Sequence, residues 1–208
     1  MRWPIRRPGR TVQLLMGLAI SAVGIWLTIQ ARLGVAPWEV LHIGLAAKVG
    51  IGVGTASIVI GAALVVIVAM VGVRPGVGTV LNVVTIGAVL NVLLASPWLD
   101  GVGDAAVVVR ATVLLLGIVV FAVGCATYVG AHLGPGPRDG LMVAVHLRGR
   151  VPIGVARGIS EAAGLSLGWI LGGPIGAGTI AFVVCAGPAV GLAFRLLRLQ
   201  PVRRSPPV

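Results

Sequence analysis

The sequence predicts an all-α membrane protein of about six transmembrane helices, built as two three-helix repeats that each carry an additional short helix. Hydrophobic residues make up 58% of the chain and charged residues only 10%, whereas a soluble domain carries about 25% charged residues. Apolar runs of about 20 residues recur along the chain, and this length crosses a hydrocarbon core of about 30 Å. A membrane β-barrel is disfavoured because no strand-length segments alternate apolar with polar residues.

Internal repetition is the third observation behind this fold class. Leu33-Gly34 and Pro37 recur as Leu133-Gly134 and Pro137, at an offset of 100 residues and without a gap. The same offset relates Gly76-Val-Gly-Thr79 to Gly176-Ala-Gly-Thr179. The predicted organisation is a basic cytoplasmic N-terminus (1–10), repeat unit 1 (11–95), a linker (96–105), repeat unit 2 (106–196) and a basic cytoplasmic tail (197–208).

Each unit is expected to contain the same elements in the same order. A first span ends at Leu-Gly, a proline turn opens a short apolar helix, and a second and a third span follow with a Gly-rich turn between them. The expected ranges are 11–30, 38–49, 55–73 and 79–95 in the first unit, and 106–130, 138–147, 154–171 and 179–196 in the second.

The two short helices decide the topology. Ten to twelve residues rise only about 15–18 Å, roughly half of the hydrocarbon core. We therefore predict that they are re-entrant or interfacial, so that each unit has three spans and the two units are inverted relative to one another. If the short helices crossed the membrane, about eight spans in two parallel repeats would result.

The net charge of +11 reflects arginines that gather near span ends. This pattern predicts a multi-pass cytoplasmic-membrane protein with both termini inside and contact with anionic lipid, and it excludes nucleic acid as a partner. Gly17 and Gly24, with their counterparts Gly117 and Gly124, form small-residue stripes at seven-residue spacing, and Gly164, Gly168 and Gly172 form another at four-residue spacing. We interpret these stripes as helix-packing surfaces.

Acidic residues stand at the start of both short helices. Glu39 follows Trp38, and Asp139 follows Arg138, each two residues after the proline. A carboxylate there caps the helix start. The alternative is that the two starts meet near the midplane, where the acids bind a cation or a proton. A shared cavity there would have one basic and one aromatic wall, which suits a small amphipathic or anionic organic solute better than a bare metal ion.

Two further polar sets are candidates. Thr79 and Thr179 follow glycines at the start of a span, where their hydroxyls cap the helix or, alternatively, help to bind an anion. Arg157 and Glu161 lie four residues apart inside a predicted span, so they share a helical face and are expected to pair.

Enzyme chemistry is not indicated. Asn82 and Asn91 are expected to bond neighbouring helices. The three histidines have no metal-ligand spacing, so neither a metal nor a cofactor is predicted. Cys125 and Cys185 are expected to be packing residues. No nucleophile elbow or paired catalytic carboxylates occur in the sequence.

The segments Leu33–Pro37-Trp38-Glu39, Gly76–Thr79, Gly134–Pro137-Arg138-Asp139-Gly140-Leu141-Met142 and Gly172-Gly173…Gly178-Thr179 resemble those of the YczE/YitT-type bacterial membrane proteins. The resemblance runs from about Arg10 to Arg198 and implies a bacterial cytoplasmic-membrane location. The functions of this family are largely uncharacterised, so the resemblance implies no catalytic residues. Glu39 departs from the aspartate expected after Pro-Trp, which keeps the charge and lengthens the side chain.

Two function classes follow from this sequence. The first is a small secondary transporter or permease for a small organic solute, which inverted repeats, broken helices and buried charges favour. The second is a non-transporting membrane scaffold or accessory protein for a partner such as a biosynthetic assembly. Homo-oligomerisation or a membrane partner fits either class.

Overall fold

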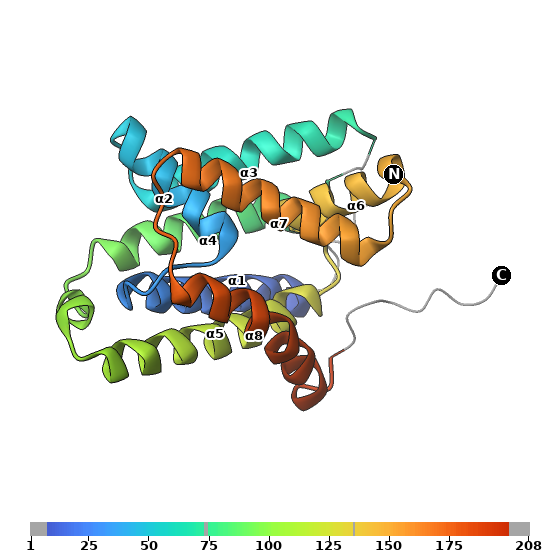
Figure 1. Ribbon diagram of the computed structural model, residues 1–208. Helices are drawn as coiled ribbons and strands as arrows, with labels where there is room; N and C mark the ends of the chain where they lie inside the picture. The colour runs from blue at the N-terminus through green and yellow to red at the C-terminus, as the bar shows by residue number, and fades with distance from the viewer. Residues whose placement is uncertain (1–7, 73–74, 135, 200–208) are drawn as a thin grey trace.

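The protein is a bundle of helices (Figure 1), described in a computed structural model over residues 8–72, 75–134 and 136–199. These residues form α-helices and one 3-10 helix, and none of them forms a β-strand. In chain order the elements are α1 (Pro8–Gln30), α2 (Pro37–Val49), α3 (Val53–Met70), α4 (Val77–Leu94), η1 (Asp100–Asp104), α5 (Val107–Val129), α6 (Pro137–Gly149), α7 (Ile153–Ile170) and α8 (Ala177–Leu196). Most of both expected basic termini lies outside the described residues.

Five of the described helices, α1, α3, α4, α5 and α8, have the length and composition of membrane spans. The expected sixth span, 154–171, coincides with α7, which has the same 18 residues as α3. It is not among the five, because Arg157 and Glu161 lower its hydropathy. The short helices α2 and α6 each have 13 residues, too few to cross the hydrocarbon core.

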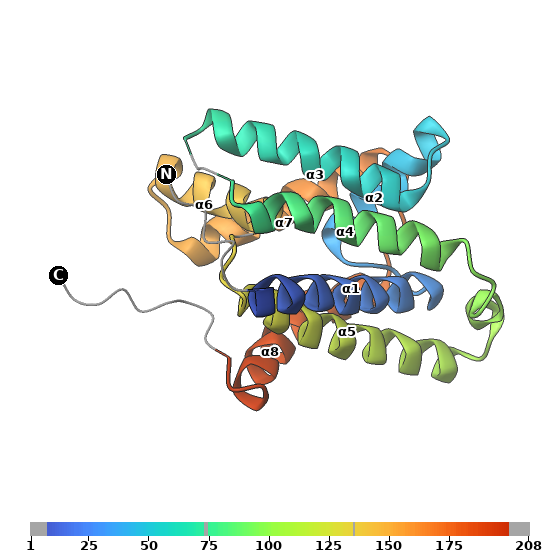
Figure 2. The same cartoon turned by 180° about the vertical axis from the view of Figure 1, so that it is seen from behind.

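Helices of the two halves begin in a common register. The starts of α2 and α6, of α3 and α7, and of α4 and α8 each differ by 100 residues. Both short helices begin at a proline, whose φ is preset for a helix. In space, α1 packs on α5, α2 on α7 and α3 on α6, so the halves are intertwined and do not form separate bodies. Figures 1 and 2 show α2 and α6 near opposite ends of the bundle.

The central pair, α1 and α5, is held close by glycines. A Cβ atom added at Gly24 would lie 2.3 Å from the Phe121 backbone nitrogen, and one added at Gly124 would lie 2.4 Å from that of Ser21. A Cβ added at Gly17 would lie 2.4 Å from the Tyr128 backbone nitrogen, and one added at Gly117 would lie 2.9 Å from the Gly24 oxygen. The two small-residue stripes are therefore packing surfaces, as predicted.

The three glycines of the predicted second stripe, Gly164, Gly168 and Gly172, have two different roles. Gly164 packs against the Trp38 ring and Gly168 against the backbone of Leu41, which seats α2 on α7. Gly172 does not belong to this surface: it follows the helix with φ of 84°, a left-handed conformation that glycine adopts without strain. The predicted stripe is thus shorter than expected.

Two loops of different halves close on each other reciprocally. The Gly78 N–H donates to the Leu133 carbonyl at 2.9 Å, and the Gly178 N–H donates to the Leu33 carbonyl at 2.7 Å. A Cβ at Gly176 would lie 2.4 Å from the Leu33 oxygen, so a side chain there would block the contact. Helix-end N–H groups are thereby satisfied inside the protein, which lipid requires.

The topology makes a first prediction. Figures 1 and 2 place η1 at the end of the bundle opposite to α6 and to the first turn of α1. With the termini inside, an Asp100→Cys variant lacking both native cysteines should react with an impermeant thiol reagent in intact cells. An Arg148→Cys control, at the end of α6, should react only after the membrane is broken. Labelling of Asp100→Cys that also requires broken membranes would contradict the topology.

Helix packing makes a second prediction. Gly24→Ala should lower the free energy of unfolding by about 1–3 kcal/mol, because its methyl group would overlap the α5 backbone. Gly158→Ala is the matched control, since a Cβ there meets nothing within 4 Å. Unfolding in detergent measures both. Equal stability of the two variants would mean that α1 and α5 do not pack this closely.

Candidate functional site

The starts of the two short helices meet at a buried ion pair. Arg138, in the first turn of α6, donates from Nη2 to Oε1 of Glu39, in the first turn of α2, at 2.6 Å. Glu39 is 1% exposed. The Arg138 side chain is 29% exposed. A charge-assisted bond of this length is strong, and burial of the carboxylate strengthens it further. The two predicted acids do not face one cavity: Asp139 lines the cavity described below, whereas Glu39 does not and is bound to Arg138 of the opposite short helix.

Two further side chains surround Glu39. The Arg138 guanidinium lies over the Trp38 ring, 5.7 Å from its centre. His42 Nδ1 lies 4.0 Å from Glu39 Oε1 and has no hydrogen-bond partner, and Trp38 Nε1 also has none. Because Trp38 and Arg138 stack together, they do not form the separate aromatic and basic walls predicted from the sequence.

A cavity of about 410 Å³ lies beside this ion pair and is lined by residues from each of the described helices α1 to α8. Seven pairs of its lining residues are related by the 100-residue offset. The pairs are Ile25 and Cys125, Ala36 and Gly136, His42 and Met142, Ser57 and Arg157, Gly61 and Glu161, Asn82 and Phe182, and Ile86 and Ala186. Equivalent positions of the two halves therefore face one central space.

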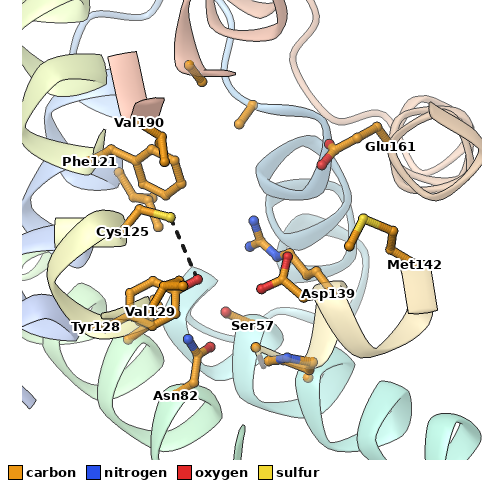
Figure 3. A pocket seen from close by; sticks show the side chains of 18 of the residues that line it. Ser57, Asn82, Phe121, Cys125, Tyr128, Val129, Asp139, Met142, Glu161 and Val190 are labelled. Atoms are coloured by element: carbon orange, nitrogen blue, oxygen red, sulfur yellow. Dashed lines mark hydrogen bonds between the residues drawn. The ribbon is translucent and has the colours of Figure 1, made fainter. Parts of the chain in front are cut away.

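The cavity has a charged side and an aromatic side. Asp139 and Glu161 direct their carboxylates into it, opposite Phe121 and Tyr128 of α5 (Figure 3). The backbone of Gly136 hydrogen-bonds the Asp139 carboxylate. The aromatic side is extended by two phenylalanines of α8, Phe182 and Phe194. The arrangement can hold a molecule with a polar head and an apolar body.

Arg157 and Glu161 share a helical face, as predicted, and both line the cavity. They do not form the expected ion pair: in the described part of the chain, no Arg157–Glu161 contact lies within the 4.0 Å that defines one. Arg157 is exposed and Glu161 half-buried. Spacing of four residues places two side chains on one face, but the long Arg157 side chain reaches a more exposed position.

Thr79 and Thr179 do not line the cavity. Thr79 Oγ1 accepts a hydrogen bond from the Gly76 N–H at 3.1 Å, and Thr179 Oγ1 accepts one from the Gly176 N–H at 3.3 Å. Both threonines thus have the capping geometry that was one of the two interpretations of this motif.

Sequence reasoning missed several lining residues. Cys125 and Tyr128 both face the cavity from α5, where the thiol lies 3.9 Å from the phenol oxygen (Figure 3). Tyr128 is the single tyrosine of the chain. This rarity was the signal in the sequence that could have marked it as a candidate lining residue. Asn82 lines the cavity, whereas Asn91 donates to Thr55 Oγ1 of α3 at 2.9 Å, the helix-to-helix bond predicted for it. Among the described residues, no three His, Cys, Asp or Glu side chains are grouped as metal ligands.

The helices, the paired short segments and the cavity lined by charged and aromatic residues define a class of polytopic membrane protein with charged groups inside its bundle. The chain belongs to the family of unknown function DUF6198, whose model matches residues 8–195.

Individual relatives agree with this family and confirm the YczE resemblance. The chain is 34% identical to the uncharacterized membrane protein YczE of Bacillus subtilis, over 92% of this chain and 93% of the relative. It is 34% identical to an uncharacterized protein of Haemophilus influenzae, over 90% and 84% of the two chains. The uncharacterized protein YyaS of Bacillus subtilis is 29% identical, over 83% and 85%. No solved structure matches this chain.

The ion pair makes a third prediction. Arg138→Ala should lower the free energy of unfolding by about 3 kcal/mol, because it leaves the Glu39 carboxylate buried and unpaired. Adding Glu39→Ala should recover part of the loss, as a double-mutant cycle in detergent would measure. The matched cycle on Arg157 and Glu161 should be close to additive. Additive effects of Glu39 and Arg138 would mean that this pair does not form.

Proposed function

We propose that this chain is a small secondary transporter for an organic solute, with two inverted repeats whose short helices, α2 and α6, are re-entrant. The observation that supports this most directly is the meeting of the two short-helix starts, at Glu39 and Arg138, beside a cavity bounded by both halves. Inverted-repeat transporters bind their solutes near the midplane, between discontinuous helices of this kind.

The cost of the charged groups supports a functional role. Asp139, Arg157 and Glu161 line a cavity within a bundle of largely apolar helices, where ionised side chains are costly. A role in packing alone would be served better by apolar residues of similar volume. Charged groups retained around an enclosed space are what solute recognition requires.

The cavity dimensions suit a small organic solute. Its volume of about 410 Å³ lies within the roughly 300–1,000 Å³ of small-molecule sites. The sequence suggested an amphipathic or an anionic solute. Arg138 is bound to Glu39, which neutralises the basic wall predicted from it. The two acids of the lining, Asp139 and Glu161, outnumber its other arginine, Arg157. An amphipathic solute remains, with its polar part at the acids and its apolar part at the aromatic side.

Flux measurements make a fourth prediction. Proteoliposomes containing the protein should take up members of a panel of amines, amino acids, carboxylates and sugars faster than empty vesicles. Glu161→Gln and Asp139→Asn should each reduce this uptake about tenfold or more, because the amide retains the size and removes the charge. Asp104→Asn is the control, since Asp104 is exposed in η1 and pairs with Arg32.

Uptake that is insensitive to both cavity variants would contradict the site. No uptake from the panel, together with stoichiometric co-purification of a membrane partner, would favour the scaffold or accessory function instead.

A further inference from the structure

The two halves differ in how their last two long helices pack. In the first half α3 packs on α4, and a Cβ at Gly54 would lie 2.1 Å from the Gly87 carbonyl oxygen. The equivalent glycines of the second half, Gly154 and Gly187, each have nothing within 4 Å of an added Cβ. In the described part of the chain, α7 and α8 are not among the pairs of helices that pack together. Figure 1 shows the separation, and Figure 2 shows α3 beside α4.

The sequence explains this separation. The bond from Asn91 to Thr55 joins α4 to α3, but the corresponding residues of the second half are Gly191 and Val155, which cannot form it. Pro188 lies inside α8 and removes a helix hydrogen bond, and the second part of α8 turns away from α7 in both views. The gap is therefore a property of these residues and distinguishes the second half from the first.

The cavity borders both of the separated helices, and a Cβ added at Gly187, one of its lining residues, would meet nothing within 4 Å. Residues of both α7 and α8 line the cavity, including Glu161 and Gly187. Exposed side chains of the same two helices include apolar ones: Val155 of α7 is 50% exposed and Val183 of α8 is 58% exposed. Because α8 has the composition of a membrane span, the exposed Val183 side chain is suited to contact with lipid.

The charges of the cavity select the head of a ligand. The cavity is lined by two carboxyl groups, those of Asp139 and Glu161, and by two guanidinium groups, of which that of Arg138 is paired with Glu39 outside the lining. When both carboxyl groups are ionised, they exceed the remaining guanidinium group of Arg157 by one negative charge. One positive charge on the ligand balances it, which in a site of low dielectric is a large contribution to selectivity.

We propose that the gap between α7 and α8 is a lateral portal through which an amphiphile with a single cationic head enters the cavity from the bilayer. The head binds between Asp139 and Glu161, and the hydrocarbon chain passes Gly187 and lies against Phe182 and Phe194 of α8. The inference rests on the proposed function in using the same cavity, and it names the class of solute.

Binding of dodecyltrimethylammonium to the full-length protein in phosphatidylcholine nanodiscs tests this proposal, with empty nanodiscs as the measure of lipid partitioning. We expect saturable binding. Dodecanoate should not compete for the site, because it adds a negative charge to the surplus. Tetramethylammonium should bind at least about tenfold more weakly, because it lacks the chain that the portal accommodates. These comparisons use the unmodified protein and do not depend on a variant folding.

Matched variants locate the portal. Gly187→Leu fills the gap where the cavity opens and should weaken dodecyltrimethylammonium binding about tenfold or more while leaving tetramethylammonium binding unchanged. Gly191→Leu, one helical turn further along α8, has the same open surroundings but does not line the cavity and should leave both unchanged. Glu161→Gln should weaken binding of both cations.

Equal effects of Gly187→Leu and Gly191→Leu, preferential binding of dodecanoate, or a second copy of the chain covering the α7–α8 gap would each overturn the portal. Uptake of tetramethylammonium with the same affinity as the long-chain cation would contradict the portal and still support the transporter function. Saturable dodecyltrimethylammonium binding without any uptake would support the portal and contradict the transporter function.

Discussion

The ion pair between Glu39 and Arg138 is the interaction on which the centre of this protein depends. Two ionised groups at 2.6 Å inside an apolar bundle are stable only if each remains paired, because a single buried charge costs several kcal/mol. Each partner stands in the first turn of a short helix, so the pair fixes both helix starts at one point. The seating of α2 on Gly164 and Gly168 and the burial of Trp38 and Leu41 hold this short helix in addition to the ion pair.

Around this centre, backbone N–H and C=O groups must form hydrogen bonds within the protein, because the membrane core offers no water. This requirement determines how the loops of the two halves contact each other. The Gly-x-Gly-Thr segment of each half donates an N–H to the Leu-Gly segment of the other, while the threonine hydroxyl accepts an N–H of its own segment. The segments must come so close that only glycine fits at Gly176 and Gly178. The same requirement explains the glycines between α1 and α5. The repeated motifs are thus contacts between halves, and each half is incomplete without the other.

The framework was predictable from the sequence because its signals are local. Proline and glycine mark the starts and ends of helices, and α2 begins one residue before the predicted 38. The cavity lining was less predictable. Cys125 and Tyr128 lie on a helix that is apolar all round, so periodicity does not reveal which face turns inward. Spacing placed Arg157 and Glu161 on one face correctly, but the direction taken by a long side chain depends on neighbours far along the chain.

The two halves are most alike where they form contacts and least alike where they line the cavity. The Leu33 and Leu133 carbonyls accept reciprocal bonds between the halves, and Thr79 and Thr179 each accept the N–H of the glycine three residues earlier, so the same motif serves in both halves. In the cavity, equivalent positions face one space, so identical charged residues would repel each other at low dielectric. Glycine at position 61 opposite Glu161 avoids this conflict and leaves room beside the carboxylate. The difference between the halves is therefore what converts a paired framework into a cavity with a charged side, an aromatic side and an opening between α7 and α8.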